Sequence, residues 1–110
     1  MANTPEKKVK EKVVKILKQR NVYYFFPATH GYGRSGVPDI ICCHRGAFLG
    51  IECKAGNNKP TALQEREMQG IRDSGGIAIV IDENNIDEVS EVLDAQEHGN
   101  SNVADGQSSR

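Results

Sequence analysis

The sequence predicts a single α/β domain in which a mixed central sheet is flanked by helices. Two observations support this fold class: apolar residues recur at helical spacing in three segments, and four other segments are β-branched, aromatic or continuously apolar. Taken in chain order, these segments read αβββαβα. The chain has 110 residues, which fits one domain.

The first helix is predicted from Pro5 to about Arg20. Thr4 is a typical N-cap, and proline is favoured at the first helical position. Apolar side chains then follow helical spacing at Val9, Val13, Ile16 and Leu17. The β-branched and aromatic run 22–26 predicts a first strand, whose aromatic residues we expect to be core and strand residues rather than platforms for base stacking.

A glycine-rich loop over 29–36 leads into a predicted β-hairpin. Its strands are expected at about 38–43 and 47–54, joined by the short turn His44-Arg45-Gly46. Residues 55–60 form a connecting loop. A second helix is expected from Thr61, its cap, to about Ser74.

The run 77–81 is continuously apolar, which is typical of a strand covered on both faces, and we therefore place it in the middle of the sheet. A last helix follows, with apolar residues from Ile86 to Leu93. From about residue 96 the chain is polar and glycine-rich. These features predict a folded domain over 1–95 and a disordered tail over 96–110.

Composition excludes several classes of protein. No apolar run is long enough to cross a bilayer, and the N-terminus lacks the apolar core of a signal peptide, so we expect a cytoplasmic protein without a membrane partner. Three cysteines, an odd number, argue against a disulfide framework. Residues 1–60 carry eleven Lys or Arg and four acids, a balance of +7, whereas residues 61–110 carry three Arg and eleven acids, a balance of −8. The basic half permits contact with nucleic acid without establishing it.

The strongest functional signal lies in the predicted hairpin. Glu52 and Lys54 are two residues apart in a strand and project from the same face. Asp39, next to Pro38, begins the partner strand and can approach Glu52. Converging carboxylates repel each other unless a cation lies between them, and hard oxygen ligands suit Mg²⁺ or Mn²⁺. Such a site, with a lysine beside it, can hydrolyse a phosphodiester bond. The alternative is a surface strand with solvated charges.

Two further residues are candidates with open alternatives. Glu6 falls on the apolar stripe of the first helix, where it either reaches the metal site or is an acid favoured by the helix dipole. Gln64 faces inward near the start of the second helix and either contacts the reacting groups or completes a capping box with Thr61. Arg34, in the glycine-rich loop, and Lys59, in the loop 55–60, are the predicted DNA contacts, although the glycine-rich loop is equally explained as an ordinary connector.

Taken together, these motifs resemble the VRR-NUC domain of the PD-(D/E)xK nuclease superfamily. The resemblance rests on Glu6-x-x-Val9-x-x-x-Val13, on GVPD at 36–39, on FLGIECKAG at 48–56 and on Thr61-x-x-Gln64, and it spans about residues 6–82. It implies a restriction-endonuclease-like αβββαβ core. It also implies an active site of Glu6, Asp39, Glu52 and Lys54, with Gln64 assisting and the backbone carbonyl of Cys53 as a further metal ligand.

The resemblance also implies what the protein does. We expect an endonuclease dependent on Mg²⁺ or Mn²⁺, without a small-molecule cofactor, that cuts DNA. Short stand-alone chains of this kind are similar to phage and bacterial proteins and to Holliday junction resolvases, which implies branched substrates, a homodimer, and a bacterial cell or phage-infected host. The alternative is a catalytically inactive nucleic-acid-binding module on the same fold.

Overall fold

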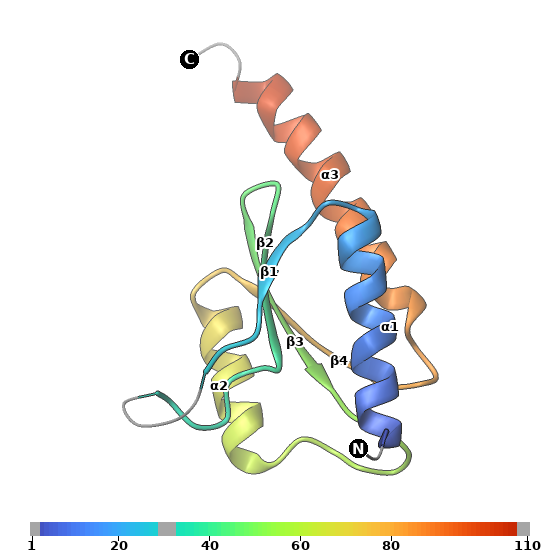
Figure 1. Cartoon of the computed structure of the whole chain (residues 1–110). Coiled ribbons are helices and arrows are strands. Elements are labelled where there is room, and N and C mark those ends of the chain that lie inside the picture. Colours follow the sequence, from blue (N-terminus) through green and yellow to red (C-terminus); the bar gives the residue numbers. More distant parts are fainter. Residues whose placement is uncertain (1–2, 29–32, 108–110) are drawn as a thin grey trace.

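The computed structural model describes residues 3–28 and 33–107, with side chains described as far as residue 98. Figure 1 shows the chain in the predicted order αβββαβα. The seven elements are α1 (Pro5–Gln19), β1 (Tyr23–Phe25), β2 (Ile40–His44), β3 (Ala47–Cys53), α2 (Ala62–Asp73), β4 (Ile77–Ile81) and α3 (Asp87–Gln107). Among the described residues, no helix is both long and apolar enough to cross a membrane.

The four strands form one mixed sheet in the order β1-β2-β3-β4. The first three strands are antiparallel, and β4 runs parallel to β3. The mixed sheet is therefore confirmed, but the prediction that β4 occupies its middle is wrong, because β4 pairs only with β3 at the edge. Its apolar run reflects cover by helices on both faces, and such cover says nothing about how many strands lie beside it.

The main core lies between the sheet and the helices α1 and α3, which cover the same face in Figure 1. Alternate residues of β3 point into this core, namely Leu49, Ile51 and Cys53. The helices contribute Val9, Val13, Leu17, Val89 and Leu93, all of them buried. The remaining residues of β3 face α2, and that alternation puts Glu52 on the side of the sheet opposite α1.

Glu97 of α3 contacts Arg20, which follows α1, and His44 at the end of β2. The Arg20 guanidinium donates to Glu97 at 3.1 Å and to Asp94 at 2.6 Å, and His44 Nε2 lies 2.8 Å from the same Glu97 carboxylate. The Glu97 contacts hold α3 against its neighbours just past residue 95, and the helix runs to Gln107. The predicted domain boundary at residue 95, with a disordered tail over 96–110, stays a prediction.

The aromatic strand β1 is more exposed than expected. The exposed fractions are 68% for Tyr23, 46% for Phe25 and 50% for Phe26, so the expectation that these residues are core is wrong. Tyr24 is the one whose ring packs against the core. For Tyr23 and Phe25 the reason is that β1 lies at the sheet edge away from α2, which packs against β4, and the α2-side face of β1 is left uncovered. Phe26 follows β1 and lies beside α1.

Candidate active site

The hairpin register brings the two predicted carboxylates together. Ile40 pairs with Ile51, so continuing the antiparallel register by one residue sets Asp39 opposite Glu52 on the same face. The backbone N–H of Cys53 donates to Asp39 Oδ2 at 2.8 Å, which holds the Asp39 carboxylate against the end of β3. The convergence of Asp39 and Glu52 that the sequence predicted is present.

The backbone of Cys53 is directed toward Asp39. The N–H of Lys54 bonds to Ile81 in β4, so Cys53, its neighbour in the strand, directs its backbone groups to the other side, toward β2. Its N–H donates to Asp39 Oδ2 on that side. Its carbonyl oxygen is directed to the same side and would be a further oxygen ligand for a cation beside Asp39.

Glu52 is a buried acid with an unusual environment. Only 1% of the residue is exposed, and its Oε1 atom is buried without a hydrogen-bond partner. Its other oxygen, Oε2, lies 3.3 Å from Lys54 Nζ. Burial raises the pKa of Glu52 to about 7, helped by the charges of Asp39 and Glu6 and opposed by Lys54. A buried carboxylate with a free oxygen requires either a proton or a cation nearby.

These residues fit a divalent metal ion. Asp39, Glu52 and the Cys53 carbonyl offer hard oxygen ligands of the kind Mg²⁺ and Mn²⁺ prefer, and the unpartnered Oε1 of Glu52 is the atom that a cation would satisfy. Among the residues that the structure describes, no three His, Cys, Asp or Glu side chains are grouped closely enough to hold a metal ion. The oxygen atoms that a cation would meet here are those of the Asp39 and Glu52 carboxylates and of the Cys53 carbonyl.

Glu6 acts on this site from a distance. It belongs to the first turn of α1, on the other side of the sheet, and its charge contributes to the raised pKa of Glu52. Among the described residues it is not part of a tight group of three acids, and the expectation that Glu6 shares one ion with Asp39 and Glu52 stays a prediction. Both alternatives for Glu6 as a single residue stay open.

The side chain of Gln64 forms a capping box with Thr61, which is the structural one of its two predicted roles. Its side-chain oxygen accepts from the Thr61 N–H at 2.9 Å, and the Gln64 N–H donates to Thr61 Oγ1 at 3.2 Å. The capping box is therefore confirmed. Because the amide oxygen is held at the N-terminus of α2, a catalytic role for Gln64 stays a prediction.

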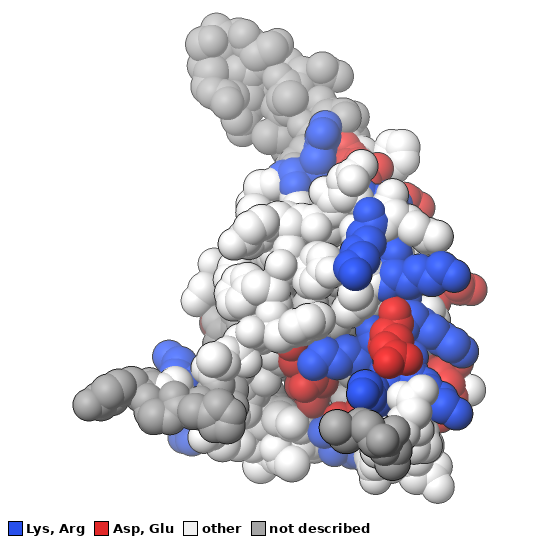
Figure 2. Space-filling view, in the orientation of Figure 1, with Lys and Arg blue, Asp and Glu red and all other residues white. Residues whose placement is uncertain are grey.

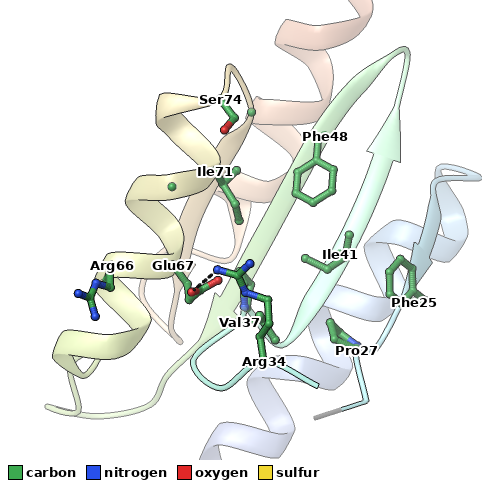
Figure 3. Close-up of a pocket in the computed structure, with 13 residues that line it drawn as sticks. Phe25, Pro27, Arg34, Val37, Ile41, Phe48, Arg66, Glu67, Ile71 and Ser74 are labelled. Atoms are coloured by element: carbon green, nitrogen blue, oxygen red, sulfur yellow. Dashed lines mark hydrogen bonds and ion pairs between the residues drawn. The ribbon is translucent and has the colours of Figure 1, made fainter. Parts of the chain in front are cut away.

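The loop leading to Asp39 packs against α2. Gly36 has φ +82°, and a side chain there would meet Leu63 Cγ at 2.7 Å. Arg34 in the same loop forms an ion pair with Glu67 of α2 at 2.9 Å (Figure 3). Arg34 and Glu67 line a groove of about 890 Å³ between α2 and the uncovered part of the sheet. Arg34 is thus paired within the protein, whereas Lys59 is exposed in the loop before α2.

Lys10 is a residue near the site that the sequence motifs did not single out. Burial and the charges of Asp39 and Glu52 raise the pKa of the Cys53 thiol to about 12, and Lys10 opposes them. The positive charge of Lys10 therefore acts at the end of β3. The sequence did offer an indication of this, because Lys10 follows the candidate Glu6 by four residues and so lies on the same face of the helix.

Comparisons with known proteins agree with this geometry. A mixed sheet that carries paired carboxylates and a lysine on adjacent hairpin strands defines a restriction-endonuclease-like protein. A solved structure described as a VRR_NUC domain superposes with a TM-score of 0.66 at 25% sequence identity, covering 80% of this chain and 96% of the other. The chain has the fold of a VRR-NUC domain, a nuclease fold, and the predicted resemblance is confirmed. No family model and no curated protein matches the sequence.

Proposed function

We propose that the protein is a metal-dependent endonuclease that hydrolyses phosphodiester bonds in DNA. The observation that supports this most is the buried Glu52, which faces Asp39, lies beside Lys54 and keeps one oxygen without a partner. An ion pair with a purely structural role would be expected to satisfy both oxygens of Glu52, because an unpaired buried charge is costly. The Oε1 atom of Glu52 has no such partner. The VRR-NUC fold supports the same reading.

The chain's own residues divide the work as follows. Asp39, Glu52 and the Cys53 carbonyl would hold Mg²⁺ or Mn²⁺, which lowers the pKa of a water molecule and neutralises charge on the phosphate when it is bound. Lys54 holds a positive charge 3.3 Å from Glu52 and is placed to orient the attacking water and to stabilise the negative charge that develops on the phosphate. Gln64 would contact the reacting groups only if the hydrogen bond between its side chain and the Thr61 N–H opened.

The first test is cleavage by the wild type and by Asp39→Asn. Single-stranded, duplex, flap and four-way DNA are incubated with Mg²⁺, Mn²⁺ or EDTA. We expect cleavage with either metal, none with EDTA, and a loss of at least about 100-fold in Asp39→Asn, because an amide does not replace an anionic ligand. A preference for four-way or flap DNA would support branched substrates, which the resemblance implies.

The same assay separates the two classes of function. A protein that binds these DNAs tightly but cuts none of them with either metal would be a binding module, and the nuclease proposal would fall. Cleavage that persists in EDTA would contradict the metal assignment alone.

We also propose that the protein works as a homodimer through the uncovered sheet face. Tyr23 pairs with Cys43 and Cys43 with Phe48, so these side chains share one face with Phe25, next to the groove of Figure 3. Monomers rarely expose a contiguous apolar patch of this kind, and tyrosine and phenylalanine are enriched at interfaces. A two-fold axis would bring this face against its own copy.

The double variant Phe25→Ser/Phe48→Ser is expected to be monomeric at concentrations where the wild type is dimeric, as measured by sedimentation equilibrium. Phe26→Ser is the matched control, because Phe26 is equally exposed but lies against α1. Cys43 provides a second readout: burial raises the pKa of Cys42 and Cys53 to about 12, which leaves the exposed Cys43 as the reactive thiol. Its labelling should slow as protein concentration rises, and concentration-independent labelling would contradict this interface.

A further inference from the structure

Helix α1 carries the densest positive charge on the surface. Figure 2 shows Lys and Arg side chains gathered over this helix. They border a groove of about 860 Å³ between α1 and the chain just after β1. The groove is lined by Lys7, Lys10, Glu11, Val14, Lys15, Lys18, Gln19 and Phe26. Its rim therefore holds four ammonium groups and one carboxylate.

This charge is not neutralised within the protein. Among the described residues, the only lysine in an ion pair is Lys54. Two acids of the C-terminal half, Asp94 and Glu97, bind Arg20 instead. Unpaired lysines along one helix face are common on solvated surfaces, so their number alone decides nothing. Two other features are more informative: the position of these lysines relative to the β2–β3 hairpin, and the Phe26 ring that lines the same groove.

One end of the groove lies close to the candidate active site. Val9, the neighbour of Lys10 on α1, packs in the same core cluster as Cys53 of β3, and the N-terminal end of α1 lies beside the end of β3 (Figure 1). Lys10 also lines the groove, with its Nζ 4.3 Å from the centre of the Phe26 ring. The half-exposed Phe26 ring therefore holds Lys10 in place, and Lys15 and Lys18 continue along the helix away from the site.

The lysines that line the groove span a distance that covers several phosphates of a nucleic-acid backbone. Lys7 and Lys18 are eleven residues apart, about 17 Å at 1.5 Å per residue. That distance equals about five base pairs of duplex along one strand. We propose, resting on the proposed nuclease function, that this lysine face of α1 binds the phosphate backbone of a duplex arm next to the cleaved bond.

The test compares two double variants of the same helix. Lys10→Gln/Lys18→Gln removes two charges from the groove, whereas Lys8→Gln/Lys12→Gln removes two exposed lysines that do not line it. Both pairs change the net charge equally, and glutamine keeps the helix propensity of lysine. Affinity for a 30-base-pair duplex and for a single strand of the same length is measured in EDTA across a salt series, so that no cleavage occurs.

We expect the groove variant to lower the slope of log K against log salt by up to about 1.8 on duplex, because each lost phosphate contact contributes about 0.9. The control pair should leave the slope within about 0.5 of the wild type, as expected when no phosphate contact is lost. Equal changes in the two variants, or a change confined to the single strand, would overturn the proposal.

A failure of the α1 binding surface can be told apart from a failure of the proposed nuclease activity. If the wild type cuts DNA while the two pairs behave alike, the α1 surface is wrong and the activity stands. If the wild type binds no DNA and cuts none, both proposals fall. Folding of each variant is checked by its circular dichroism spectrum and thermal midpoint.

Discussion

Lys54→Met is expected to lower the rate of DNA cleavage by about 10²–10³-fold, the effect of removing one group that stabilises charge in the transition state. Methionine keeps much of the length of the lysine side chain but has no charge and no N–H donor. The ammonium group lies 3.3 Å from Glu52 Oε2, in the position from which it would face a water or phosphate oxygen at the metal. Since the role proposed for Lys54 is at the reacting groups rather than at the DNA flanks, affinity for DNA should change little.

Single-turnover cleavage with Mg²⁺ measures this effect separately from binding. Lys12→Met is the matched control, because Lys12 is exposed on α1 outside the lysine-lined groove. Its rate should equal that of the wild type. A Lys54→Met protein that cuts at the wild-type rate would show that Lys54 has no part in catalysis, whatever its distance from Glu52.

Glu52→Gln is expected to stabilise the metal-free protein at neutral pH. Burial, with the charge of Asp39, raises the pKa of Glu52 from 4.5 to about 7, so the folded protein holds a proton that the unfolded chain has released. Stability of the wild type should therefore fall as pH rises from about 4.5 to about 7 and level off above it. The loss is at most about 3 kcal/mol, because each pKa unit corresponds to about 1.4 kcal/mol.

Thermal unfolding from pH 4 to 8, with and without Mg²⁺, tests this linkage. In EDTA the wild type should lose stability across that window, while the variant, which has no proton to lose at position 52, should not. Mg²⁺ should raise the midpoint of the wild type at pH 8 and leave that of the variant almost unchanged, since ligands that bind the native state stabilise it. A metal-free wild type that gains stability from pH 5 to 7, relative to Glu52→Gln, would contradict the assigned environment.

The central pair of the site was predictable because it depends on local geometry. Strand alternation fixes the face shared by Glu52 and Lys54, and a short turn at Arg45-Gly46 fixes the register that sets Asp39 opposite Glu52. Both residues of that turn have positive φ, 54° and 86°. Nothing outside the hairpin is needed to bring these groups together.

Features that depend on distant contacts were harder to predict. The apolar run of β4 indicates cover by helices but leaves its place in the sheet undetermined. The exposure of Tyr23 and Phe25 depends on where α2 packs, and the contacts of α3 depend on Arg20 and His44 meeting Glu97. Whether Glu6 reaches the metal site depends on how α1 crosses the sheet, which periodicity within one helix does not encode.

Gly50 limits how the protein can diverge in sequence. It lies on β3, two residues before Glu52, and a methyl group there would come within 2.8 Å of Pro38 Cγ and 3.0 Å of Ile71 Cδ1. Even alanine would thus push apart the proline that precedes Asp39 and the helix behind it. Homologous chains that drift at position 50 would need compensating changes in α2, so this glycine and residue 71 should vary together or not at all.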